Sequence, residues 1–121
     1  MTPTTTTQLD AKALRNLCLL DPNGSTGLLR RVLNTYLSSL ARLLGQLDIA
    51  EARGDAASIR LVMHTLKSSS ASIGALTLSQ LCGAAETAVR EARAEAMCEL
   101  LSQVRQEVEQ VVPAVHDLLT A

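Results

Sequence analysis

Apolar residues recur along most of this chain at alternating steps of three and four positions, which is the pattern of amphipathic helices. Each stretch of this pattern ends near a glycine or a polar run, where a helix can stop. The predicted helices span about Ser25–Arg53, Asp55–Gly74, Leu76–Arg90 and Ala94–Leu119. Pro113 is expected to kink the last of them, because a proline ring removes a backbone donor and clashes with the preceding turn.

The segment before these helices is predicted to be short and partly irregular. Asp10 can cap a helix that runs to about Leu19, and a turn is expected at residues 21–24, Asp-Pro-Asn-Gly. Residues 1–8 are rich in threonine and show no apolar period, so we expect a disordered tail or linker remnant there. Residues 9–121 are then one all-α domain, an antiparallel up-down-up-down four-helix bundle with a short extra N-terminal helix.

Composition narrows the range of functions. The chain has 121 residues, a net charge of −1 and Tyr36 as its single aromatic residue, so it offers neither the basic field nor the stacking rings that hold nucleic acid. No apolar run approaches the length of a membrane span, and we expect no direct membrane contact. The three cysteines, Cys18, Cys82 and Cys98, are expected to be buried thiols in a reducing compartment, the cytoplasm.

The chemistry is expected in the stretch from His64 to Ala75, H-T-L-K-S-S-S-A-S-I-G-A. On a helix, His64 shares one stripe with Lys67, Ser68 and Ala71, and this stripe points away from the core. A neutral imidazole can accept a phosphoryl group, and a nearby cation helps because negative charge spreads over the phosphoryl oxygens during transfer. Lys67 can supply that cation, and Ser68 a hydrogen bond. An exposed histidine near a lysine is, however, also common on a merely solvated helix face.

The same string, followed by Leu78, Cys82 and Glu86, closely resembles the signature of the histidine phosphotransfer (HPt) domain family. The positions that match in place are Leu66, Lys67, Ser69, Ile73 and Gly74. The resemblance implies a four-helix bundle whose exposed histidine, here His64, carries a phosphoryl group between aspartates of response-regulator receiver domains. It also implies no kinase activity, no bound nucleotide, and no cofactor or metal on this chain, because the Mg²⁺ used in transfer sits on the receiver.

Two features near His64 stay open on the sequence alone. The family usually has glycine four residues after the histidine, and Ser68 in that place could obstruct a receiver or bind a phosphoryl oxygen. Leu61 lies on the surface and is either an ordinary exposed leucine or part of an apolar docking patch with Ala71. Arg60 and Lys67 would then flank this patch and attract the acidic pocket of a receiver.

Other functions rank lower. A bundle that binds a receiver or another signalling protein without transferring phosphate is the alternative, motivated by Ser68. A hydrolase is disfavoured because no acidic partner is evident that would orient His64. The other histidine, His116, is expected to be a surface residue, and no ligand spacing indicates a metal site. The partners are therefore receiver domains and a hybrid sensor histidine kinase, of which this chain could also be the cytoplasmic C-terminal part.

Overall fold

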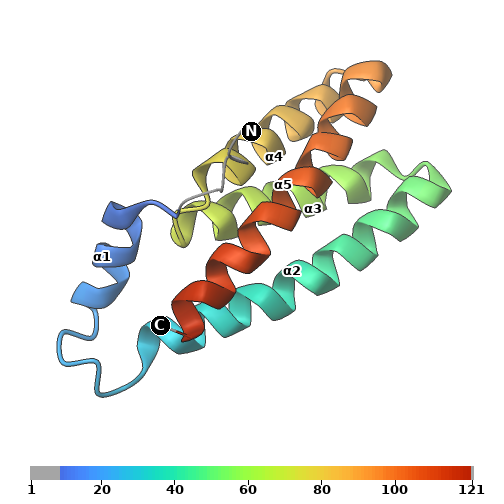
Figure 1. Ribbon diagram of the computed structural model, residues 1–121. Helices are drawn as coiled ribbons and strands as arrows, with labels where there is room; N and C mark the ends of the chain where they lie inside the picture. Colours follow the sequence, from blue (N-terminus) through green and yellow to red (C-terminus); the bar gives the residue numbers. More distant parts are fainter. Residues whose placement is uncertain (1–8, 121) are drawn as a thin grey trace, which may run out of the picture.

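The computed structural model describes residues 9–120, which form five α-helices. The expected tail, residues 1–8, lies outside the described residues. The helices are α1 (Ala11–Leu19), α2 (Leu28–Arg53), α3 (Ala56–Ser72), α4 (Leu76–Arg90) and α5 (Ala94–Thr120). Helices α2 to α5 run alternately up and down, and each packs against the next, while α5 also contacts α2 (Figure 1). The predicted four-helix bundle with a short N-terminal helix is confirmed.

The apolar stripes read from the sequence form the core of this bundle. Helix α3 buries five residues, Ile59, Val62, Met63, Leu66 and Ser70, and the hydroxyl of Ser70 hydrogen-bonds Tyr36 Oη at 2.8 Å. The largest fully buried side chains come from all four long helices: Leu33, Leu40, Leu47, Met63, Leu66, Ile73, Leu78, Cys82, Leu101, Val104, Val111 and Val115. At roughly 1.5–3 kcal/mol for each large apolar side chain, this burial is the main force holding the helices together.

The start of α2 differs from the expected position by one turn. Helix α2 begins at Leu28 and not near Ser25, because Gly27 adopts a left-handed backbone conformation with φ 64°. The carboxylate of Asp21 accepts hydrogen bonds from the backbone amides of Thr26 and Leu28. A hydrogen bond from the Thr26 side chain and, to a lesser extent, these two backbone bonds hold the pKa of Asp21 below its ordinary value, so a charged carboxylate ties the loop before α2 together.

The N-terminal segment is tied to the turn between α3 and α4. The backbone amide of Asp10 donates to the carbonyl oxygen of Gly74 at 2.8 Å, and a Cβ on Gly74 would lie 2.5 Å from that same nitrogen. Only glycine fits this position, which also has φ 83°. Helix α1, capped by Asp10 as predicted, therefore sits at one end of the bundle, as Figure 1 shows.

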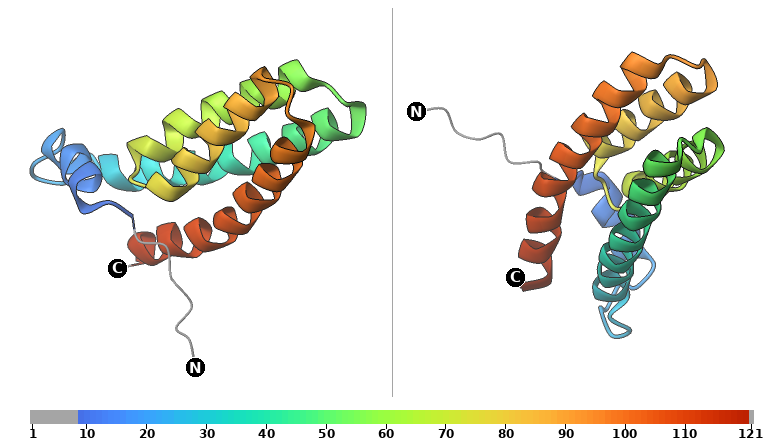
Figure 2. Two further views of the ribbon diagram at one scale, coloured as in Figure 1. Left: turned by 90° about the horizontal axis from the view of Figure 1, so that it is seen from above. Right: turned by 90° about the vertical axis from the view of Figure 1, so that its right-hand side faces the viewer.

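Helix α5 continues through Pro113 without interruption and is visibly curved in Figure 2. A proline inside a helix leaves one carbonyl without its usual donor, which favours bending. No helix within residues 9–120 is long and apolar enough to cross a membrane.

The prediction of three buried cysteines is wrong for two of them. Cys82 is buried in the core, and burial raises the pKa of its thiol to about 12. Cys18 and Cys98 are exposed. Cys18 lies on α1, which buries none of its residues fully. Cys98 lies on α5 but is not one of the residues that this helix buries, such as Leu101. The expectation followed the usual burial of free cysteines and not the position of these two residues relative to the apolar stripes.

Candidate functional site

His64 lies near the middle of α3 on its outward side, and its side chain is 59% exposed. The neighbouring Met63 and Leu66 are fully buried and fix this helix against the bundle. The imidazole therefore projects from a rigid element rather than from a loop, as the sequence predicted. A group built on a helix in this way is held in a defined orientation toward a partner.

The imidazole is held by an acidic residue from the neighbouring helix. Glu86 lies on α4, and its side chain is only 11% exposed. One of its carboxylate oxygens, Oε2, lies 2.9 Å from His64 Nδ1, and the other, Oε1, accepts a hydrogen bond from Lys67 Nζ at 2.8 Å. Glu86 thus bridges the two residues that the sequence singled out.

Glu86 is ionised at neutral pH. The hydrogen bond from Lys67 and, to a lesser extent, the one from His64 hold the pKa of Glu86 below its ordinary value, although burial acts in the opposite direction. An ionised carboxylate can only accept hydrogen bonds, so His64 Nδ1 must carry the proton that it shares with Oε2. In the neutral ring the lone pair then lies on Nε2, the nitrogen that Glu86 leaves free.

The expectation that no acidic group orients His64 is wrong. Sequence reasoning missed this contact because Glu86 lies 22 residues beyond His64, on a different helix. Periodicity within α3 could not reveal it. The one available signal was the place of Glu86 in the family signature, and that signal did not assign a role to the carboxylate.

The serines around His64 differ in their surroundings. Ser68 is exposed, and its Oγ hydrogen-bonds no other residue of the described chain, while its carbonyl oxygen accepts a bond from Ser72 Oγ at 3.1 Å. Ser70 is fully buried and Ser69 half-buried, with Ser69 Oγ donating to the Leu66 carbonyl at 3.3 Å. Ser70 is therefore part of the core, whereas Ser68 lies on the surface beside His64.

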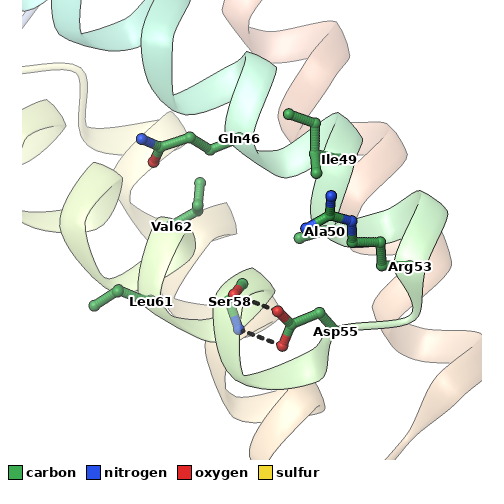
Figure 3. A pocket seen from close by; sticks show the side chains of 8 residues that line it. All are labelled: Gln46, Ile49, Ala50, Arg53, Asp55, Ser58, Leu61 and Val62. Carbon is green, nitrogen blue, oxygen red and sulfur yellow. Dashed lines mark hydrogen bonds between the residues drawn. The ribbon is translucent and has the colours of Figure 1, made fainter.

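The predicted docking residues Arg60, Leu61 and Ala71 are all exposed on α3. Leu61, 65% exposed, lines a shallow groove of about 220 Å³ between α2 and α3, which Figure 3 shows from close by. Ile49 of α2 lines the same groove and is 55% exposed. The groove residues are Gln46, Ile49, Ala50, Arg53, Asp55, Ser58, Leu61 and Val62. Ile49 was not anticipated, because the sequence does not show which part of α2 lies beside Leu61.

Within the described part of the chain, no group of three or more His, Cys, Asp or Glu side chains is placed to hold a metal ion. The second histidine, His116, is exposed near the end of α5, and its carbonyl oxygen accepts a bond from Thr120 Oγ1 at 3.1 Å. His64, Glu86 and Lys67, joined by hydrogen bonds, form the candidate site.

Comparisons with known proteins found a matching family model and a solved structure of similar fold. The family model described as Hpt domain matches residues 31–114. The fold is similar to the crystal structure of histidine-containing phosphotransfer protein B from Pseudomonas aeruginosa, with a TM-score of 0.83 and 23% sequence identity. That match covers 93% of this chain and 95% of the other. A comparison with curated protein sequences gave no match.

Proposed function

This chain belongs to the Hpt domain family, and on that premise we propose that His64 is the residue that carries the phosphoryl group. Members of this family are phosphotransfer intermediates of phosphorelays and not classical enzymes. His64 receives the phosphoryl group from the aspartate of one receiver domain and delivers it to the aspartate of another. The observation that carries the assignment is the hydrogen bond between His64 Nδ1 and Glu86 Oε2 at 2.9 Å.

That hydrogen bond prepares the ring for nucleophilic attack. The Nε2 lone pair attacks phosphorus, the bond between phosphorus and the aspartyl oxygen breaks, and its electron pair stays on the departing carboxylate. The product ring carries a phosphoryl group on Nε2, a proton on Nδ1 and a positive charge. Glu86 faces this charge through Nδ1 and stabilises it as it develops, and delivery to the next aspartate reverses the same steps.

Lys67 and Ser68 act on the phosphoryl group itself. Lys67 Nζ is 2.8 Å from Glu86 Oε1, and its side chain remains partly exposed beside His64. Its charge offsets the negative charge on the equatorial oxygens in a loose transition state. Ser68 lies one helical turn beyond His64, where its hydroxyl can donate to one of these oxygens.

A receiver docks on the outward side of α3. Leu61 and Ala71 offer apolar contact on either side of His64, and Ile49 extends that surface onto α2. Arg60 attracts the acidic pocket of the receiver, so association is faster at low ionic strength. The Mg²⁺ ion needed for transfer belongs to the receiver, and this chain supplies neither a metal nor a kinase activity of its own.

The setting we propose is the cytoplasm, either as a free-standing protein or as the C-terminal part of a hybrid sensor histidine kinase. Receiver domains and their acyl phosphates are the partners that the His64 chemistry requires. A second candidate function is a module that binds a receiver without transfer. Ser68 motivates it, because a side chain stands where the family usually has glycine.

A transfer assay separates these functions. The protein is mixed with a receiver bearing a labelled aspartyl phosphate, and acid-labile, base-stable label on the protein is measured. We expect label on the wild type and on His116→Gln, which keeps His64, and none on His64→Gln. Undiminished labelling of His64→Gln would refute the assignment. Receiver binding without label on the wild type, for any donor, would favour the binding module.

A further inference from the structure

Gly83 occupies an unfavourable place for a glycine, the interior of α4. Glycine in a helix interior lowers helix stability relative to alanine, because it loses more backbone freedom on folding. The backbone of Gly83 does not require glycine, since its φ is not positive. A Cβ at this position would approach one neighbouring side chain, with Lys67 Cδ at 3.2 Å. The missing side chain at position 83 therefore leaves room for the side chain of Lys67.

Three residues of α4 contact Lys67 at successive points. Ser79, Gly83 and Glu86 follow each other at helical spacing and lie on the face of α4 that meets α3. Ser79 Oγ donates to the carbonyl oxygen of Lys67 at 2.8 Å. Gly83 borders the aliphatic stem, and Glu86 Oε1 binds the ammonium group at 2.8 Å. The backbone, stem and charge of Lys67 are thus each met by one residue of this α4 stripe.

We propose that Gly83 is a positioning residue. Because it has no side chain, the aliphatic stem of Lys67 can cross α4 at this point. The ammonium group of Lys67 thereby reaches Glu86 beside His64. A contact of 3.2 Å is tighter than ordinary van der Waals contact, so a methyl group at position 83 pushes the stem aside by a few tenths of an ångström. The ammonium group shifts with the stem, and its hydrogen bond to Glu86 is weakened. The effect on transfer rests on the proposed function of His64, whereas the placement of Lys67 does not.

The chain contains a matched control for this idea. Gly45 also lies inside a helix, α2, but a Cβ there would meet no atom within 4 Å. Replacing it by alanine should bring only the gain in helix propensity. Gly45→Ala is expected to raise the folding equilibrium constant about two- to fivefold, measured by urea unfolding, and to leave transfer unchanged.

For Gly83→Ala we expect a smaller gain in stability than for Gly45→Ala. We also expect a shifted NMR signal of the His64 Nδ1 proton, and transfer slowed by about three- to tenfold. In a Lys67→Ala background the stem is gone, so Gly83→Ala should there match the full stability gain of Gly45→Ala. This double-mutant cycle isolates the coupling between the two positions.

The inference is overturned if Gly83→Ala stabilises the wild type as much as Gly45→Ala does and leaves the His64 signal in place. An equal effect of Gly83→Ala with and without Lys67 would overturn it as well. The stability cycle and the His64 signal need no phosphoryl donor. If His64→Gln still accepted phosphate, the proposed function would fail while these two readouts still decided the role of Gly83.

Discussion

At the scale of single residues, the proposed role of His64 depends on Glu86. Its carboxylate is nearly buried, and both of its oxygens have partners, His64 Nδ1 and Lys67 Nζ. A buried charge is tolerated only when it is paired and hydrogen-bonded in this way. The same contacts select the tautomer with Nε2 free. In the proposed function, the reactivity of His64 therefore depends on a residue of another helix as much as on its own exposure.

Removing this carboxylate should slow transfer without unfolding the bundle. In Glu86→Ala the ring loses the acceptor for Nδ1 and divides between two tautomers, and Lys67 loses its anchor. We expect the transfer rate from a phosphorylated receiver to fall about ten- to a hundredfold, as when other orienting partners are removed. Glu109→Ala, an exposed carboxylate on α5, should transfer as the wild type does. Equal rates for the two variants would contradict the role of Glu86.

The pKa of Glu86 also predicts how stability responds to acid. Because the folded-state pKa lies below its ordinary value of 4.5, the carboxylate stabilises the fold above that pH. This contribution is lost as the pH falls below about 4.5 and through the folded-state pKa. The difference in unfolding free energy between wild type and Glu86→Gln should therefore shrink from about pH 6 to about pH 3.5 in urea titrations. A constant difference over this range would show that Glu86 gains nothing from its partners.

At the scale of helices, α2, α3 and α4 end in the same hydrogen-bonded motif. A residue two or three positions past the end of each helix donates to the carbonyl oxygen five residues before it: Asp55 to Ala50, Ala75 to Ser70, and Arg93 to Ala88. The residue before each donor is left-handed. It is glycine after the first two helices, which is why the sequence located those ends. After α4 it is Ala92, with φ 54°, and there a polar run rather than a glycine indicated the end of the helix.

The left-handed alanine after α4, where the other two helix ends have glycine, predicts a stabilising substitution. A left-handed alanine costs about 1–2 kcal/mol, whereas glycine adopts this conformation freely and loses somewhat more entropy on folding. We expect Ala92→Gly to raise the free energy of unfolding by about 0.5–1 kcal/mol. The matched change Ala41→Gly, at an exposed position inside α2, should lower it by about the same amount. Denaturant unfolding of both variants tests this, and a loss of stability in Ala92→Gly would contradict it.

At the scale of the whole molecule, the sequence predicted the bundle well because one periodic stripe per helix determines which side faces the core. The outward position of His64 followed from the same stripe. Contacts between helices did not follow from it. Glu86 beneath His64, Ile49 beside Leu61 and the backbone bond between Asp10 and Gly74 all depend on how helices are placed against each other. Periodicity determines which side of a helix faces the core, but not how far the helix is shifted along its axis relative to its neighbours.

The central claim is that His64 Nε2 carries the phosphoryl group while Nδ1 remains protonated against Glu86. Long-range ¹H–¹⁵N NMR of the ring, recorded before and after phosphorylation by a receiver, tests this most directly. We predict that Nδ1 of His64 is protonated in both spectra and that Nε2 alone gains coupling to phosphorus. A phosphoryl group on His64 Nδ1, or on His116, would contradict the account.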